Sequence, residues 1–192
     1  KLDAVRQYGS ERLDPVKATF VPAGEYNRKA LQNPKEAQAI VDEIVRCHED
    51  PAYQNKTFGV INLFPGAKRH HEKILLLLRE QLGAEAIAER KLLCGTSQEF
   101  QGTERDVIFL SMVITPPDNG YRIPKYPDPL GAATKRFNVA ASRAKDQMWL
   151  FHSVSQEQLH PDCLRFNLLN YCQSPIALEY EPYDEEVSRT IP

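Results

Sequence analysis

"DVIFLSMVI", residues 106–114, is an almost continuous run of apolar residues. The run does not alternate between polar and apolar side chains, so a strand formed here would bury both of its faces. Strands of this kind are typical of a parallel sheet that lies between two layers of helices. Three further stretches share the pattern, namely TFGVINLF (57–64), KLLCG (91–95) and QMWLFHS (147–153). We therefore expect a mostly parallel sheet built around these four runs.

Helical patterns separate these strands along the chain. Residues 33–50 begin with Asn33 as a capping residue, Pro34 in the first turn and Glu36 in a box-like cap. The apolar stripe of this helix consists of Ala37, Ile40, Val41, Ile44, Val45 and His48. A second helix is expected over residues 67–82, with Ile74, Leu75, Leu78 and Leu82 turned inward. Strands that alternate with helices predict an α/β three-layer sandwich.

The remaining stretches are expected at the margins of this sheet. Residues 16–21, "VKATFV", alternate as in a strand at a sheet edge, and residues 163–172 suit a short helix that packs on the edge. Residues 115–133 are proline-rich, and they are longer than the about 12–15 residues of an ordinary structureless connection, so we expect a functional or mobile loop. Trp149 and Phe151 lie within a predicted buried strand, which favours a core role over base stacking.

The composition is that of an ordinary globular protein, with 192 residues, 42% hydrophobic, 26% charged and a net charge of −2. No apolar run approaches the roughly 18 residues of a membrane span, and there is no signal-peptide pattern, so we expect a cytoplasmic protein without a membrane partner. The chain begins at Lys1 rather than at a methionine, which suggests a piece of a longer protein. We expect an N-terminal edge segment (1–30), one domain (31–175) and an acidic linker toward a further domain (176–192).

Metal binding and a strongly basic surface are both disfavoured. The four cysteines form no Cys-x-x-Cys pair, so reduced thiols are expected rather than a zinc site or disulfides. Adjacent His70 and His71 would point to different sides of a helix, so we predict no metal site. Positive charge is concentrated in residues 67–73 and 134–145, but charge runs of this kind are most often solvated faces.

Two polar stretches stand out against this scaffold. Residues 136–145, "RFNVAASRAK", predict a helix that seats Phe137 and three alanines (140, 141 and 144) on the sheet. Arg136 and Arg143 are seven residues apart, almost two helical turns, so they would leave the same side of that helix. Guanidinium groups held in this way can bind phosphate bidentately. The simpler alternative is a half-exposed helix with solvated arginines.

The second stretch is "GTSQEFQGTERDVIFLS", residues 95–111, where a polar loop separates two apolar strands. A crevice at the carboxyl ends of such strands is a usual ligand site, so we expect the loop there. Gly102 permits close backbone approach, Gln101 and Thr96 offer neutral hydrogen bonds, and Glu104 offers a carboxylate acceptor. The simpler alternative is a charged turn that leads into a strand.

Together these stretches resemble superfamily 1 helicases. "FQGTERDVIFLS" is similar to motif V, "RFNVAASRAK" to motif VI and "FGVINLF" (58–64) to the motif IV strand, in the order and spacing of that family. The resemblance covers roughly residues 35–153 and implies the second of two RecA-like motor domains. It is greatest for large bacterial helicase-like proteins. The first domain, with the phosphate-binding loop and the magnesium ligands, would lie elsewhere, since no G-x-x-x-x-G-K-[ST] occurs in the sequence.

The resemblance assigns roles to matching positions. Arg143 corresponds to the motif VI arginine that reaches the γ-phosphate of ATP, with Arg136 in a supporting role. Glu104 corresponds to the glutamate that contacts the nucleotide sugar, with Gln101 and Gly102 in the turn that shapes the pocket. Thr96 and Asn62 correspond to residues that face the nucleic-acid backbone. Two positions depart from the family pattern, because Gln98 replaces an aspartate and Ala67 a glutamine.

The resemblance thus implies an ATP-dependent helicase or translocase. ATP and Mg²⁺ would bind between this domain and the first RecA-like domain of the same protein, and single-stranded nucleic acid, with DNA favoured, would be the track. The isolated fragment is expected to lack ATPase activity because it has no phosphate-binding loop. The alternative is a non-catalytic nucleic-acid-binding or regulatory module that retains the helicase-like fold. A nuclease would need a carboxylate–lysine cluster, which we do not find in this sequence.

Overall fold

A computed structural model describes residues 13–22, 24, 31–64, 66–116, 122–125 and 131–174. Five strands form one sheet in the order β1-β5-β4-β2-β3, and every neighbouring pair is parallel. The strands are β1 (Val16–Phe20), β2 (Phe58–Asn62), β3 (Leu93–Thr96), β4 (Arg105–Ser111) and β5 (Ala144–His152). The predicted edge strand and the four strands predicted from apolar runs are therefore confirmed, with β3 at the second edge of the sheet.

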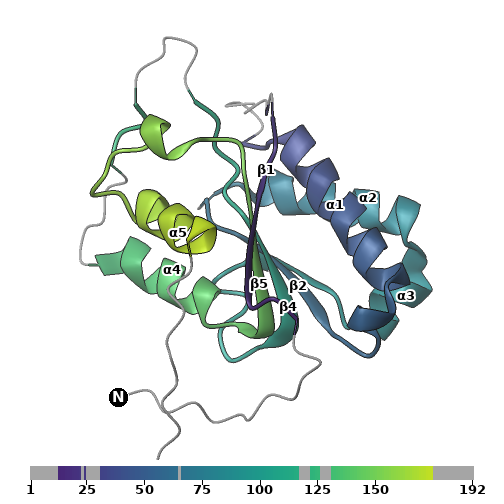
Figure 1. The fold of residues 1–192 in the computed structure, drawn as a ribbon. Helices are drawn as coiled ribbons and strands as arrows, with labels where there is room; N and C mark the ends of the chain where they lie inside the picture. Colours follow the sequence, from purple (N-terminus) through teal and green to yellow (C-terminus); the bar gives the residue numbers. More distant parts are fainter. Residues whose placement is uncertain are drawn as a thin grey trace, which may run out of the picture.

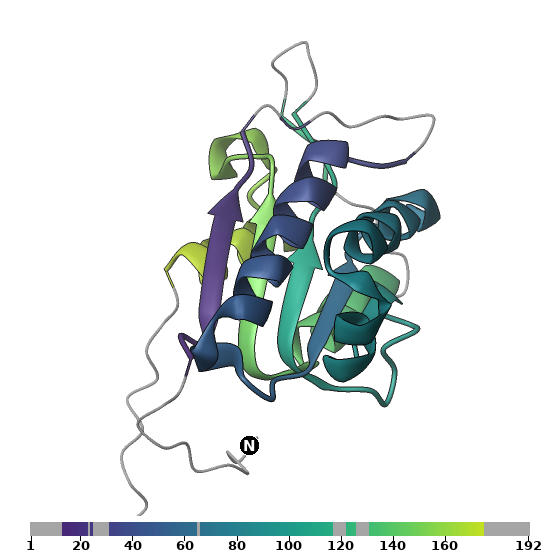
Figure 2. The ribbon, with the colours of Figure 1, turned by 90° about the vertical axis from the view of Figure 1, so that its right-hand side faces the viewer.

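Helices cover both faces of the sheet. The helices α1 (Pro34–Glu49), α2 (Lys68–Gln81) and α3 (Gly83–Glu89) lie on one face, while α4 (Ala132–Ala141) and α5 (Leu164–Gln173) lie on the other (Figure 1). Two short 3₁₀ helices, η1 (Pro51–Tyr53) and η3 (Gln156–Gln158), complete the described elements. Turned by 90°, the ribbon shows α1 lying across the sheet with the strands running side by side behind it (Figure 2). The predicted α/β three-layer sandwich is confirmed.

Successive side chains of each strand point to opposite faces of the sheet, so the core consists of two halves, one on each face. In β4, Val107 and Phe109 belong to the apolar cluster under α1 and α2, whereas Ile108 and Leu110 belong to the cluster under α4 and α5. Trp149 and Phe151 lie in the first cluster, stacked with ring centroids 5.9 Å apart. Their predicted role as core residues is confirmed.

The start of α1 follows the sequence prediction in part. The Asn33 side chain accepts a hydrogen bond from the Glu36 backbone N–H at 3.1 Å, and Pro34 is the first helical residue. The Glu36 side chain does not complete the expected box-like cap. It turns inward instead, where it accepts hydrogen bonds from Ser111 and from the backbone of Val113.

Other helix predictions differ from the structure by small shifts. In α2, Ile74 and Leu78 are buried as predicted, but Leu75 and Leu82 are only partly buried and Leu77 is buried in their place. The predicted helix at residues 163–172 is α5, which packs against β1 and β5. Much of the predicted loop at 115–133, the start of the predicted edge segment and the acidic segment 176–192 lie outside the described residues.

Candidate functional site

The predicted site residues lie at two opposite ends of the sheet. Asn62 and Thr96 are register partners at the carboxyl ends of β2 and β3. Glu104 and Arg143 stand directly before the first residues of β4 and β5, at the amino ends. Because β4 has seven residues at about 3.3 Å each, the two groups are separated by roughly 20 Å.

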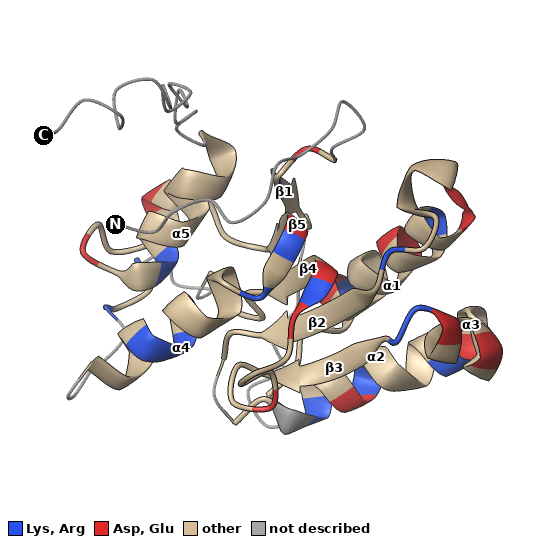
Figure 3. Ribbon diagram, turned by 90° about the horizontal axis from the view of Figure 1, so that it is seen from below, with Lys and Arg blue, Asp and Glu red and all other residues tan. Residues whose placement is uncertain are grey.

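At the amino ends, motifs V and VI are joined by the backbone. Arg105 and Ala144 are register partners, and the Arg105 N–H donates to the Arg143 carbonyl oxygen at 3.1 Å. The residues before this pair, Glu104 and Arg143, are therefore neighbours across the two strands. Figure 3, seen from below, shows basic and acidic segments together at the starts of β4 and β5, and a further basic segment on α4. The fold brings together two residues that lie 39 positions apart in the sequence.

The structure corrects the expected geometry of the motif VI arginines. Helix α4 ends at Ala141, so Arg143 lies in the turn before β5 and not on one helix face with Arg136. Ala141 is exposed, and Ala144 is already the first residue of β5. The helix ends here because the carbonyl oxygen of Arg143 pairs with β4, which draws the chain into the sheet.

The Arg143 side chain folds back on its own helix. Its Nε donates to the Val139 carbonyl at 3.1 Å, and its Nη2 donates to the Ser142 hydroxyl at 2.9 Å. A cation near a helix carboxyl end is favourable, because the last carbonyl groups carry partial negative charge. Two of the three guanidinium nitrogens are thus engaged within the domain.

The loop between β3 and β4 also differs from the prediction. It starts at the carboxyl end of β3, but a parallel β4 must begin at the opposite edge, so the loop runs back along the sheet. Phe100 anchors it and is fully buried. A Cβ built on Gly59 would lie 2.7 Å from the Phe100 ring, so glycine in β2 makes room for this anchor. Gln101, Gly102 and Glu104 consequently lie toward the amino edge, not in a crevice at the carboxyl ends.

The end of this loop is open to solvent. Gln101 and Glu104 are exposed, and within the described residues neither side chain makes a hydrogen bond or ion pair. Gly102 has a φ of 77°, and a Cβ built there would meet nothing within 4 Å. The glycine is needed for its left-handed backbone, and the space beside it is open. Arg136 is half-buried on α4.

Polar side chains also connect the starts of β4 and β5 to the residues just before β2. Asp106 accepts hydrogen bonds from the Thr57 N–H at 2.8 Å and from its hydroxyl at 2.6 Å, and Lys56 forms an ion pair with Asp146. Burial alone would raise the pKa of Asp106, but the Thr57 hydrogen bonds, helped by Lys145 and Lys56, hold it below its usual value. The strand beginnings that carry Glu104 and Arg143 are therefore cross-linked to β2. No sequence pattern singled out Thr57.

At the carboxyl ends, both predicted nucleic-acid residues are engaged internally. Asn62 is buried, its Nδ2 donates to the Ala67 carbonyl at 2.8 Å, and its Oδ1 accepts from the Phe64 N–H at 2.9 Å. This amide shapes the turn into α2 and leaves no exposed group for a phosphate. The Thr96 hydroxyl is half-buried and donates to the Glu99 carboxylate at 3.0 Å.

Comparison with known proteins agrees with this architecture. A family model described as an AAA domain (AAA_12) matches residues 16–155, which is more than half of the chain. The chain belongs to this AAA domain family. It is a helicase-like domain of the P-loop NTPase type, and its helix-flanked parallel sheet is a RecA-like arrangement. A search of curated proteins finds no match.

The AAA domain also contains a buried polar cluster that sequence reasoning missed. The cluster consists of Asn33, Glu36, His70, Ser111 and Ser153, all buried at the carboxyl end of the sheet. Burial raises the pKa of Glu36 to about 7 in spite of its hydrogen bonds, and burial lowers the pKa of His70 to about 4, helped by nearby His71. The only sequence signal was a glutamate at a helix start, which local reasoning assigned to capping.

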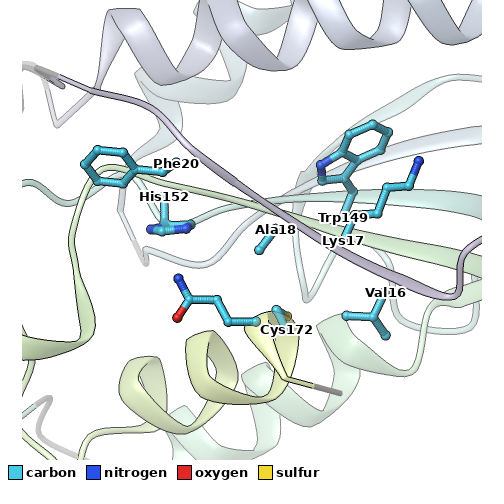
Figure 4. Close-up of a pocket in the computed structure, with 8 residues that line it drawn as sticks. Val16, Lys17, Ala18, Phe20, Trp149, His152 and Cys172 are labelled. Atoms are coloured by element: carbon cyan, nitrogen blue, oxygen red, sulfur yellow. The ribbon is translucent and has the colours of Figure 1, made fainter. Parts of the chain in front are cut away.

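One hollow of the AAA domain lies away from both groups of predicted site residues. It has a volume of about 460 Å³ and lies between the edge strand β1 and the end of α5, where Ala18, Phe20 and Cys172 contribute to its lining (Figure 4). None of the predicted site residues lines it.

Among the described residues, no three histidine, cysteine, aspartate or glutamate side chains are grouped as metal ligands. None of the helices described here has both the length and the apolar character required to cross a membrane.

Proposed function

We propose that this chain is the second motor domain of an ATP-dependent superfamily 1 helicase or translocase. The observation that carries the proposal is the junction of Glu104 and Arg143 at one edge of the sheet, joined through the Arg105 N–H and the Arg143 carbonyl. In this proposal the Glu104 carboxylate would bind the nucleotide sugar and the Arg143 guanidinium its phosphates, and their neighbouring positions let both reach one nucleotide. In this proposal the first RecA-like domain of the same protein supplies the phosphate-binding loop and the Mg²⁺ ligands.

The amino edge fits an ATP molecule that is shared with a second domain. Open space beside Gly102 admits a ligand close to the backbone, and the exposed Glu104 carboxylate can accept hydrogen bonds from ribose hydroxyls. Gln101 shapes the same rim, and Arg136 supports the phosphate side. Arg143 is the catalytic residue, since it would neutralise negative charge on the transferred phosphoryl group. In this role ATP is the substrate whose terminal phosphate is lost to water.

The docked conformation of Arg143 suggests how the finger is controlled. Its Nε and Nη2 donate from a cationic guanidinium to two neutral acceptors, the Val139 carbonyl and the Ser142 hydroxyl, and each bond is worth at most about 1.5–3 kcal/mol. A phosphate carries negative charge of its own and can accept two parallel bonds from a guanidinium, so it binds the group more strongly. We therefore expect the guanidinium to leave α4 when the first domain presents the triphosphate.

The opposite edge of the sheet would face single-stranded nucleic acid, with DNA favoured. Thr96 remains the proposed contact at the end of β3, where its hydroxyl would have to exchange Glu99 for a phosphate oxygen. Asn62 acts instead through the turn that it braces, so its direct contact with the backbone is not retained. All four cysteines are free and buried, in keeping with the reduced thiols of a cytoplasmic protein.

ATP hydrolysis by the full-length protein tests the proposal. Arg143→Ala should lower kcat by about 10³–10⁵, the usual contribution of an arginine finger, while ATP still binds. Arg79→Ala removes an exposed arginine of α2 and is the matched control, which should hydrolyse ATP normally. Hydrolysis that Arg143→Ala leaves unchanged would refute the assignment of the finger.

One observation favours the alternative of a non-catalytic module. The Arg143 guanidinium is satisfied within the domain, as expected of a structural arginine that caps a helix. A binding module would bind single-stranded nucleic acid without any hydrolysis of ATP by the wild-type full-length protein. The same ATPase measurement therefore separates the two functions.

A further inference from the structure

The buried carboxylate of Glu36 connects the ends of two strands to the start of α1. Glu36 is fully buried, and its Oε1 accepts hydrogen bonds from the Ser111 hydroxyl at 2.5 Å and from the Val113 N–H at 2.7 Å. Its Oε2 accepts from the Ser153 hydroxyl at 3.3 Å and from the Asn33 amide at 3.4 Å. A charge taken out of water in this way is tolerated only where donors surround it.

Helix α2 joins this network through His70, and the direction of each hydrogen bond is determined. The Asn33 N–H donates to His70 Nδ1 at 3.2 Å, so the neutral ring carries its proton on Nε2. That proton is donated to the Ser111 hydroxyl at 2.7 Å, and Ser111 in turn donates to Glu36. Glu36 Oε1 accepts from both the Ser111 hydroxyl and the Val113 N–H, which is possible for the ionised carboxylate and for a carboxyl protonated on Oε2, so the carboxyl group orients Ser111 and His70.

The network holds the chain in a conformation that it would otherwise avoid. Val113 has a φ of 67°, which is strongly disfavoured for a β-branched residue. Its N–H points to Glu36 Oε1, and this bond offsets the backbone strain. Glu36 therefore sets the path of the chain as it leaves β4.

The same network fixes the place where α2 begins. His70 lies in the first turn of α2, and Ser111 is the register partner of Asn62, whose amide holds the Ala67 carbonyl just before that turn. Asn62 is in turn the register partner of Thr96. Hydrogen bonds thus connect Glu36 to Ser111 and, through it, to His70, and Ser111 lies in sheet register with Asn62 and, one strand further, Thr96.

We propose that Glu36 is a positioning residue for the nucleic-acid face, acting through Ser111 and His70 on the start of α2 and through Val113 on the exit of β4. This inference rests on the proposed function, because it assumes that the carboxyl edge binds single-stranded nucleic acid. Glu36 is buried and does not touch the nucleic acid itself. It sets the geometry in which the backbone and side chains of that edge meet phosphates.

The test uses the full-length protein and two variants that interrupt the network at different points. Glu36→Gln keeps the size of the side chain but removes its charge, and Ser111→Ala cuts the link to His70 while the Val113 bond to Glu36 remains. Glu43→Gln is the control, because Glu43 is a buried glutamate of the same helix that pairs with Arg46 outside the network. Each protein is titrated with a fluorescent single-stranded oligonucleotide, and the KM for ATP is measured beside it.

We expect both network variants to weaken oligonucleotide binding by about three- to thirtyfold, the range that buried networks transmit between sites. The KM for ATP should remain unchanged, since the nucleotide residues lie at the other edge, and Glu43→Gln should behave as wild type. A merely structural role would lower the melting temperature of the variants but leave the oligonucleotide Kd unaltered below it. Wild-type affinity in a folded Ser111→Ala or Glu36→Gln variant would overturn the proposal.

Hydrogen exchange separates this proposal from the proposed function. The Val113 amide and the first turn of α2 should lose protection in Glu36→Gln, and the α2 turn should lose it in Ser111→Ala, but neither should in Glu43→Gln. If the wild-type protein bound no oligonucleotide, the proposed function would be refuted. The exchange rates would still show whether Glu36 positions the exit of β4 and the start of α2. Unchanged protection in both network variants would refute that role whatever the protein binds.

Discussion

The pH dependence of stability offers a sharp test of the buried Glu36–His70 network. Burial raises the pKa of Glu36 from an ordinary 4.5 to about 7, and burial lowers the pKa of His70 from 6.5 to about 4. The raised glutamate pKa makes the folded state lose stability as the pH rises from about 4.5 to about 7, because the carboxyl must then ionise inside the protein. The lowered histidine pKa has the opposite sign, so stability is present above about 6.5 and is lost as the pH falls toward 4.

The two effects are of similar size and cancel over most of their range. Each pKa differs from its ordinary value by about 2.5, and at about 1.4 kcal/mol per pH unit each corresponds to about 3 kcal/mol of unfolding free energy. Between about pH 4.5 and 6.5 the contribution of the pair to wild-type stability should therefore be nearly flat. Removing either residue should leave the pH dependence of stability that the other residue causes.

Glu36→Gln and His70→Gln should therefore respond to pH in opposite directions. Relative to wild type, Glu36→Gln should gain about 3 kcal/mol of stability as the pH rises from 4.5 to 7. His70→Gln should gain about the same amount, relative to wild type, as the pH falls from 6.5 to 4. Differences between variants are informative here because Asp106 and His152, which also have shifted pKa values, are present in every protein and drop out.

Urea unfolding followed by tryptophan fluorescence measures these differences. Trp149 is the only tryptophan of the sequence and lies stacked against Phe109 and Phe151 in the core, so its emission reports global unfolding. Glu43→Gln serves again as the control for loss of a buried glutamate. The quantity compared is the unfolding free energy of each variant minus that of the wild type, plotted against pH. A difference that does not change with pH for either network variant, or that changes in the same direction for both, would refute the raised pKa of Glu36 and the lowered pKa of His70.

Four further substitutions, at three positions, test the loop that carries the proposed nucleotide residues and the strands that hold it. Gly59→Ala should lower the unfolding free energy by about 1–3 kcal/mol, because the new methyl group would press on Phe100, and normal stability in urea would contradict the packing. Gly102→Ala should lower the unfolding free energy by about 1 kcal/mol, and Gly102→Asn should lower it by less, since asparagine tolerates a positive φ. A larger loss for Gly102→Asn than for Gly102→Ala would argue against a left-handed backbone at this position. Asp106→Asn should lower the unfolding free energy by about 1 kcal/mol at pH 7. This deficit should shrink below about pH 4, because the wild-type carboxyl then becomes protonated and loses the stability that its lowered pKa reflects. A deficit that is constant with pH would exclude hydrogen bonds between an ionised Asp106 and Thr57.

Local physics was sufficient to predict the architecture. The apolar runs at 57–64 and 106–114 became strands because side chains on both faces must be buried between two helical layers. Asn33 and Pro34 began α1 because a side-chain acceptor and a missing N–H suit the first turn of any helix. The motif resemblance, for its part, agrees with the AAA domain family that matches residues 16–155.

The arrangement of the site was decided by tertiary structure alone. A helical projection placed Arg143 beside Arg136, but pairing between β4 and β5 ended α4 two residues before Arg143. The loop that carries Glu104 leaves β3 at one edge and must cross the sheet, because the next strand is parallel.

Glu36 shows most clearly how the prediction from sequence differs from the tertiary structure. From sequence it is one acidic residue in the first turn of a helix, and a solvated cap is the natural interpretation. Only the packed sheet brings Ser111 and the Val113 N–H to it, from more than 70 positions away. Periodicity and capping depend on neighbours within a few residues, so the sequence by itself determined the strands and helices. Burial, pKa values and the grouping of distant side chains depend on which elements come to lie together, and these only the tertiary structure could decide.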